Sequence, residues 1–191
     1  QRIREQVPAL EMRRAEGAIK ERTWLPREIE QDSAAGAAVR AQVGKAAYDL
    51  NVQQFACAGL NYGYFYDRSP LIMYDGEPQP AYTMYDYTPS TVPGCRTPHF
   101  WLPEGRSLYD AMGPCYTLLR FDVDVDVSPL AHAAAARRVP LTILDCPSHQ
   151  LPAPYRHKLL LSRPDQHVAW RGDSLPLDID GLVDRLTGSP G

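Results

Sequence analysis

Short apolar runs in the second half of the chain follow one another at spacings typical of a compact α/β domain. The runs that predict strands lie at residues 100–102, 107–109, 116–121, 141–144, 158–162 and 167–170. Residues 128–138 lie between the third and fourth runs and predict a helix, because Ser128 and Pro129 suit its N-cap and first position. The last two runs flank Pro164 and Asp165, which predicts a hairpin.

The pattern changes near the C-terminal end, where apolar residues recur at helical intervals. Ile179, Leu182, Val183 and Leu186 stand at positions i, i+3, i+4 and i+7, and Gly188 follows them as a C-terminal stop. The predicted order is therefore three strands, a helix, three strands and a second helix. We expect the strand after the first of these helices to be buried, because it consists of consecutive apolar residues apart from one threonine.

Two longer helical patterns precede this domain. Charged, helix-forming residues predict a helix at residues 8–22, with Pro8 in its first turn. Asp32 is the predicted N-cap of a second helix that reaches Gln54. Its apolar face consists of Ala35, Val39, Val43, Ala46 and Leu50. Two glycines lower its helix propensity, so we expect its stability to come from packing on a partner surface.

Residues 59–98 lack such periodicity and are rich in tyrosine, proline and glycine. Six prolines in this stretch limit any regular element. Seven tyrosines lie between Tyr62 and Tyr87 inclusive, and each combines an apolar ring with a polar tip. We therefore expect an extended connector that lies along a protein surface, either of this chain or of a part missing from it.

Length and charge narrow the class of protein. A chain of 191 residues allows one compact domain with an N-terminal extension, and a net charge of −3 offers no basic surface for nucleic acid or anionic lipid. The apolar runs are far shorter than the roughly 20 residues that span a bilayer. Gln1 stands where a complete protein would have Met, and no signal peptide follows it. We expect a cytoplasmic piece of a longer protein, without nucleic-acid or membrane partners.

The four cysteines, Cys57, Cys95, Cys115 and Cys146, form no C-x-x-C pair. Their wide spacing is typical neither of a zinc site nor of a compact disulfide framework. Free thiols in a reducing compartment are therefore the favoured interpretation.

Several stretches share a pattern with one enzyme family. They read GLNYGYFYDRSP at residues 59–70, PHFWL at 98–102, GRSLYD at 105–110, YTLL at 116–119 and RPDQHVAWRG at 163–172. Together with the predicted order of elements, they resemble the C-terminal region of FAD-dependent aromatic-ring hydroxylases of the phenol hydroxylase and 3-(3-hydroxyphenyl)propionate hydroxylase type. The resemblance covers residues 28–188.

The resemblance implies an α/β fold with a thioredoxin-like C-terminal domain at residues 99–191. It implies that residues 1–58 are a helical segment from the end of the flavin domain. The Tyr/Pro-rich connector at residues 59–98 would join this segment to the C-terminal domain. The complete enzyme would contain FAD and would hydroxylate a phenolic ring with oxygen and either NADH or NADPH. The implied partners are the enzyme's own N-terminal flavin and substrate domains, and a homo-oligomer is a further option.

The chain departs from a complete enzyme of this family in one decisive feature. It has no G-x-G-x-x-G after a predicted strand, so the turn that binds the FAD pyrophosphate is absent. We expect this chain alone to hold no cofactor and to be inactive. A thiol activity would need a cysteine at the head of the helix after the central strand, where the sequence reads VSPLAH at residues 127–132.

The candidate pocket or interface residues are Tyr62, Tyr64, Tyr66 and Arg68, which the resemblance places in the segment nearest the missing domains. Packing of the connector on a domain surface is the favoured interpretation of these tyrosines. No catalytic, cofactor-binding or metal-binding residue is predicted.

Two other groups were weighed and not assigned a function. Asp122, Asp124 and Asp126 would project from one face of a strand, but the glycine and glutamate of a calcium loop do not follow, so a solvated strand end is favoured. His99 and His167 lie in the family-like stretches, and ordinary hydrogen bonding is favoured for both over catalysis.

The sequence therefore predicts the C-terminal portion of a flavin-dependent aromatic hydroxylase, with a structural role in docking, stabilisation and subunit contacts. The first alternative is a free-standing thioredoxin-like redox protein that uses Cys115 or Cys146. The second is a non-enzymatic interaction module whose connector binds a separate protein.

Overall fold

The computed structural model describes residues 26–146 and 151–188, so the helix predicted at residues 8–22 lies outside the described part. Its internal contacts divide the chain into two units. One unit contains Gln1–Asn61 and Thr83–Asp86, and the other contains Tyr62–Tyr82 and Tyr87–Gly191. The predicted domain boundaries after residues 58 and 98 stay predictions.

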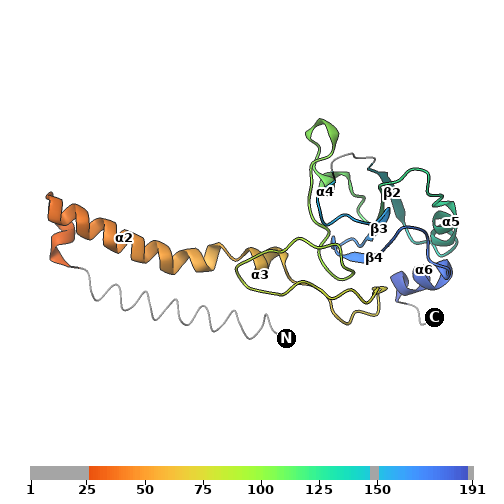
Figure 1. Cartoon of the computed structure of the whole chain (residues 1–191), viewed down its shortest axis with the longest axis horizontal. Coiled ribbons are helices and arrows are strands. Elements are labelled where there is room, and N and C mark those ends of the chain that lie inside the picture. The colour runs from red at the N-terminus through yellow and green to blue at the C-terminus, as the bar shows by residue number, and fades with distance from the viewer. Residues whose placement is uncertain (1–25, 147–150, 189–191) are drawn as a thin grey trace. The chain divides into compact units, whose positions relative to one another are not determined.

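A mixed sheet of four strands organises the second unit (Figure 1). Its strands are β1 (Tyr116–Arg120), β2 (Leu141–Asp145), β3 (Leu159–Ser162) and β4 (Val168–Gly172), in the order β2-β1-β3-β4. β1 and β2 are parallel, whereas β3 runs antiparallel to β1 and β4. The predicted hairpin of the last two strands is thereby confirmed.

Both faces of the sheet are covered, which explains why β1, β3 and β4 are almost continuously apolar. On one face α5 (Ser128–Ala136) and α6 (Ile179–Thr187) pack their apolar side chains against Leu118 and Leu161. On the other face, Phe100, Tyr155 and α4 (Leu108–Ala111) pack against Leu119 and Leu160. Figure 1 shows α5 and α6 together on one side of the strands.

The last predicted helix is confirmed at both ends. Asp178 caps the start of α6 by accepting a hydrogen bond from the Gly181 amide at 2.8 Å. Gly188 ends the helix in the left-handed conformation, with φ of 74°. Arg137, at the end of α5, forms ion pairs with Asp180 and Asp184 and so joins the two helices.

Two predicted strands are wrong. Residues 100–102 and 107–109 contribute only an isolated bridge between Trp101 and Ser107, around a short 3-10 turn at Pro103–Gly105. Ser107 acts as an N-cap, because its hydroxyl accepts the Tyr109 amide hydrogen, and the chain therefore enters α4. The predicted burial of the strand at residues 141–144 is also wrong, since β2 lies at the sheet edge and is only partly buried.

The described elements of the first unit are η1 (Arg27–Glu30), the long helix α2 (Ala34–Phe55) and α3 (Ala58–Tyr62), whose last residue, Tyr62, already belongs to the second unit. The predicted second helix is confirmed with a different cap, because Ser33 rather than Asp32 accepts the Gly36 amide hydrogen at 3.1 Å. Gly36 is required by packing, since a Cβ there would run into the carbonyl oxygens of Gln31 and Glu28. Among the described helices, none combines the length and apolar character needed to cross a membrane.

Residues 63–95, all of them described, contain no helix or strand. Part of this stretch runs along the outer edge of β4, where Val168 exchanges backbone hydrogen bonds of 2.8 Å and 2.9 Å with Gly94 and Cys95. A register shift between Leu161 and Ser162 leaves Ala169 without a partner on β3. The Ala169 carbonyl instead accepts the Met73 amide hydrogen at 2.9 Å.

Candidate functional site

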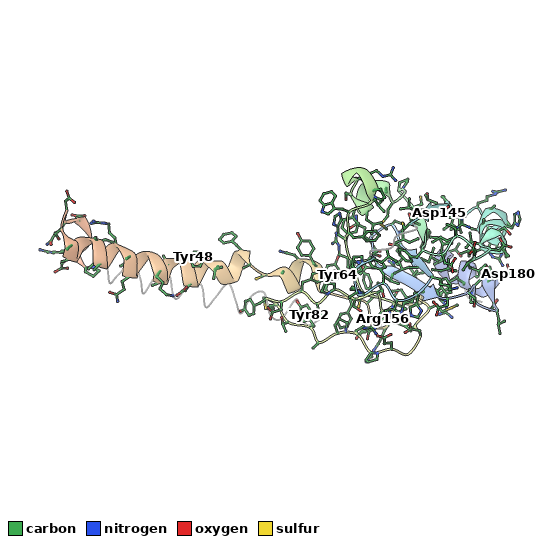
Figure 2. The ribbon with its side chains drawn as sticks, turned by 45° about the horizontal axis from the view of Figure 1, so that its top comes forward. Tyr48, Tyr64, Tyr82, Asp145, Arg156 and Asp180 are labelled. Atoms are coloured by element: carbon green, nitrogen blue, oxygen red, sulfur yellow. The ribbon has the colours of Figure 1, made fainter. Side chains whose placement is uncertain are left out.

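Two of the predicted tyrosines pack on the turn between β3 and β4. His167 in that turn is fully buried. The rings of Tyr64, labelled in Figure 2, and Tyr66 lie with their centroids 4.9 Å and 4.8 Å from the imidazole centroid. The two tyrosine rings meet edge to face at 6.4 Å. We call Tyr64, Tyr66 and His167 the aromatic clamp.

A glycine lets the backbone bring the clamp together. The Tyr66 amide donates to the Gly94 carbonyl at 3.0 Å, and the Gly94 amide donates to the Val168 carbonyl at 2.8 Å. Gly94 has φ of 99°, and a Cβ at this position would overlap the Tyr66 carbonyl oxygen. The position therefore requires glycine, because only a residue without Cβ fits both the backbone angle and the contact.

The turn under the clamp is held by charge. Arg163 forms a two-pronged ion pair with Asp165, through Nε at 3.1 Å and Nη2 at 3.0 Å. The Arg163 guanidinium also lies 5.1 Å from the centroid of the Tyr66 ring, within cation–π range. The Tyr66 hydroxyl donates to Asp165 Oδ2 at 3.3 Å. One ion pair thus supports the ring that closes the clamp.

The charge state of Asp165 follows from these contacts. Burial raises its pKa, but hydrogen bonds from His167 and Arg163 and the positive charge of Arg163 outweigh burial and hold it well below the ordinary value. The His167 Nδ1 lies 2.9 Å from the Asp165 carbonyl oxygen, which can only accept, so Nδ1 carries the hydrogen. Burial, followed by the Asp165 charge, raises the pKa of Tyr66.

Two buried nitrogens in the clamp region, His167 Nε2 and Arg163 Nη1, have no hydrogen-bond partner among the described residues. Both belong to side chains that lie against tyrosine rings. The negative face of the Tyr66 ring attracts the cationic Arg163 guanidinium, which is the compensating contact that the geometry offers this side chain.

A second cluster surrounds Arg96. Its guanidinium lies 5.5 Å from the ring centroid of Tyr62 and 5.3 Å from that of Tyr109, and its Nη2 donates to Gln166 Oε1 at 2.5 Å. The Tyr109 hydroxyl donates to the Thr97 carbonyl at 2.6 Å. Tyr62 therefore packs on a cation next to the turn and does not join the aromatic clamp.

Arg171 on β4 forms a third link between the sheet and residues 63–95. Its side chain is 4% exposed, and its Nε donates to Asp75 at 2.8 Å and its Nη1 to Thr91 at 3.0 Å. Its Nη2 forms an ion pair with Glu77. Burial raises the pKa of Asp75, and the hydrogen bonds and charge of Arg171 reverse that effect, so the net shift is downward. We call Arg171, Asp75, Glu77 and Thr91 the ionic anchor.

The structure separates the four residues of the predicted pocket or interface. Tyr64 and Tyr66 belong to the clamp and Tyr62 to the Arg96 cluster, whereas Arg68 is exposed and forms no hydrogen bond or ion pair with the described residues. Sequence reasoning missed every charged residue that supports them. The signal for two of these was present in the stretch RPDQHVAWRG, where an arginine and an aspartate two residues apart precede the histidine.

His99 has the hydrogen bond that was expected of it. Its Nε2 lies 2.9 Å from the Ser107 hydroxyl, and its ring lies edge-on to Trp101 and Tyr109 at 4.9 Å and 5.2 Å. Trp101 is 69% exposed, so the cluster faces solvent in the described part of the chain.

Two buried cysteines, Cys95 and Cys146, are poor candidates for an activated thiol. Burial raises the pKa of both Cys95 and Cys146 to about 11, so these thiols stay protonated at neutral pH. No disulfide joins any of the four cysteines, all of which lie in the described part of the chain, and α5 begins with Ser128 and Pro129, preceded by Val127. The helix head after β1 therefore lacks the sulfur that thiol exchange requires.

Two of the three aspartates after β1 have partners for their carboxylates. Asp122 pairs with Lys158 at 2.8 Å, and Asp126 accepts the Ser128 amide hydrogen at 2.9 Å. Within the described ranges, no cluster of three or more potential ligand side chains fits a metal ion. The same turn does not fit the pyrophosphate of FAD, because carboxylates stand where glycine amides would be needed and Pro129 lacks an N–H.

Comparison with known proteins gives consistent similarities. Residues 90–190 match the sequence profile of the family described as aromatic-ring hydroxylase, C-terminal. The chain is 31% identical to phenol 2-monooxygenase of Pseudomonas sp. (strain EST1001) in an alignment of 179 residues that covers 83% of this chain and 29% of that protein. It is 32% identical to the FAD-dependent monooxygenase apdD of Emericella nidulans in an alignment of 104 residues that covers 50% of this chain and 16% of that one.

Solved structures show the same likeness. A structure described as native and K252c-bound RebC-10x superposes with a TM-score of 0.71 at 33% identity, over 92% of this chain and 34% of that one. The flavin-dependent monooxygenase PieE, solved with FAD and substrate, gives a TM-score of 0.59 at 26% identity, over 85% of this chain and 31% of that one. The chain thus spans less than a third of the curated relatives' length and about a third of these solved chains.

Proposed function

Because the chain belongs to the aromatic-ring hydroxylase family, which it matches over that family's C-terminal domain, we propose that it is the C-terminal portion of an FAD-dependent monooxygenase that hydroxylates phenolic rings. Reduced nicotinamide and oxygen would be the co-substrates of the complete enzyme. The names of the similar proteins, a phenol 2-monooxygenase and several FAD-dependent monooxygenases, support this assignment.

The proposal includes a thioredoxin-like organisation of the last part of the chain. Its support is the sheet order β2-β1-β3-β4, in which β3 runs antiparallel to its neighbours, together with a helix between β1 and β2 and another after β4. A mixed four-stranded sheet with these crossovers is the arrangement that such a domain requires.

The role of this portion in the enzyme would be structural. The observation that carries this part of the proposal is that β4 and its turn hold residues 64–77 at two places, through the aromatic clamp and the ionic anchor. A segment fixed by a buried arginine and a buried histidine has a defined path over the sheet. The chain that precedes it therefore leaves the domain at a defined position, as a docking element must.

Oxygen activation belongs to FAD, which supplies that chemistry when it is bound by the remainder of the enzyme. The described turn after β1 does not fit the FAD pyrophosphate, so no catalytic step is assigned to this chain. Its contribution would be to stabilise the catalytic portion and to take part in subunit contacts.

The experiment is a truncation of the complete enzyme before residue 99. We expect the truncated enzyme to lose soluble yield, bound flavin absorbance and thermal stability together, with phenol as the probe substrate. A matched control is Leu177→Ser in the full-length enzyme, because this side chain is fully exposed and its loss should change none of the three readings. A truncated enzyme that remains soluble, yellow and fully active would refute the structural role.

The thiol redox alternative is less well supported. Its candidate sulfur Cys146 is buried with a raised pKa, and Cys115 has no second sulfur bonded to it. An insulin-reduction assay separates the two functions, since turnover that disappears in Cys146→Ser or Cys115→Ser would favour the redox protein.

A further inference from the structure

The two edges of the sheet differ in whether other backbone covers them. The outer edge of β4 is covered, because Val168 and Ala169 exchange backbone hydrogen bonds with residues 73 and 94–95. The outer edge of β2 has no such cover in the part of the chain that the structure describes. Ile143, at the centre of β2, is 38% exposed. An edge of this kind is a template for pairing with another strand.

β2 also lacks the features that usually prevent such pairing. The strand reads LTILD, without proline, lysine or a bulge, and its register with β1 is continuous. Its single charged residue, Asp145, is neutralised from the neighbouring strand, since Arg120 binds it through Nε at 2.6 Å and Nη2 at 2.8 Å. The carboxylate therefore does not protect the edge as an unpaired charge would.

We propose that β2 pairs antiparallel with β2 of a second copy of this chain, so that two four-stranded sheets join into one. A two-fold axis through Ile143 places this residue opposite itself, Thr142 opposite Leu144, and Leu141 opposite Asp145. The central contacts are then β-branched or apolar pairs, which stabilise antiparallel strands. Antiparallel self-pairing places each residue of a strand opposite a residue of the same strand read in reverse. β2 allows this, because none of the resulting pairs joins two like charges.

The charges at the strand ends fit the same arrangement. In this register the two copies of Asp145, labelled in Figure 2 at the end of β2, lie about 13 Å apart along the strands, which exceeds the screening length of about 8 Å. Arg138 is exposed and precedes β2 by three residues. It stands at the end of the strand where the Asp145 of the second copy arrives, so opposite charges approach and like charges do not.

This inference deepens the subunit-contact part of the proposed function and rests on it only there. The partner is another copy of the chain, and pairing gives a two-fold assembly that closes after two copies because each β2 has one free edge. Neither edge of the joined sheet then remains open in the described part, because both outer strands are β4, which is covered.

The test is the mass of the complete protein in solution, measured by light scattering across a concentration series. We expect the wild type to form dimers, and Ile143→Lys to weaken dimerisation at least about 100-fold, because two ammonium groups would face each other at the axis. Val123→Lys is the matched control: Val123 is 50% exposed but lies outside β2, and its replacement should leave the dimer intact. A dimer that persists in Ile143→Lys overturns the proposal.

A second variant tests the register without adding charge. Ile143→Cys should form an intermolecular disulfide under mild oxidation, because directly opposed strand residues bring their Cβ atoms within about 5.5 Å. Leu177→Cys and the wild type, which retains four native cysteines, should not cross-link under the same conditions. A monomeric wild type with β2 amides protected from hydrogen exchange would show that another segment covers the edge, which also refutes the proposal. The measured mass tests the dimer, and phenol hydroxylation by the complete enzyme tests the proposed function. Either proposal can therefore fail without the other.

Discussion

The ionic anchor and the aromatic clamp hold the same segment of chain onto β4, but they do so by different physics. The anchor depends on one buried cation, Arg171, whose guanidinium serves three partners at once. The clamp spreads its contacts over three rings and a supporting ion pair at the turn. The ionic anchor fails as a whole when Arg171 is lost, whereas the aromatic clamp loses only part of its contacts when one ring is removed.

The largest expected effect tests the anchor. Arg171→Ala removes the donor to Asp75, Glu77 and Thr91 and leaves a partly buried carboxylate without its cation. Removing one member of a buried ion pair costs about 3–5 kcal/mol, and the partial exposure of both carboxylates favours the lower end, about 3 kcal/mol. Urea unfolding of the complete protein measures the loss.

Arg137→Ala is the matched control, because its ion pairs with Asp180 and Asp184 join two helices at the surface. We expect its effect on unfolding to be clearly smaller than that of Arg171→Ala. Limited proteolysis sharpens the contrast, since only Arg171→Ala should release residues 75–77 from the sheet and expose them to cleavage. Equal losses in the two variants would show that burial does not distinguish the anchor.

The second effect tests the clamp. His167→Ala removes a fully buried ring that packs against two tyrosines, with an expected loss of about 2 kcal/mol. His167→Phe keeps a ring of similar size while it removes the hydrogen bond to the Asp165 carbonyl, and should cost about 1 kcal/mol. If Phe is as harmful as Ala, the polar contacts of the imidazole rather than its packing hold the clamp.

The elements that could be predicted from the sequence are those whose causes are local. Ile179 and its helical neighbours form one helix with the stop at Gly188, so their pattern suffices. The hairpin of β3 and β4 is similar, because Pro164 and Asp165 lie between its strands. The apolar runs at residues 100–102 and 107–109 predict two strands, but Ser107 caps α4, and this cap decides the local structure.

The anchor and the clamp could not be predicted in the same way. Arg171 binds a carboxylate 96 positions earlier, and the Tyr66 hydroxyl binds one 99 positions later. No periodicity relates residues so far apart, and each arginine alone has the appearance of a solvated surface cation. The tyrosines were recognisable as packing residues, but the surface they pack on was not, because it forms only when the β3–β4 turn closes.

The smallest expected effect concerns acidic pH, to which the ionic anchor and the aromatic clamp should respond differently. Asp75 has a lowered pKa in the folded protein, because Arg171 outweighs burial. Its contribution to stability is therefore complete above the ordinary carboxyl pKa of about 3.9 and declines as the pH falls through the lower folded value. Asp75→Asn removes this proton uptake, so between about pH 5 and pH 3 its free energy of unfolding should fall less steeply than that of the wild type, by about 0.5 kcal/mol after allowance for exposure. The edge-to-face contact between the Tyr64 and Tyr66 rings carries no charge over this range. Protection of the Tyr66 amide, which donates to Gly94, should therefore outlast the accessibility change at Asp75. Hydrogen exchange at pH 3 measures this order, and loss of the Tyr66 amide first would show that the ion pair beneath the clamp, rather than its rings, limits it.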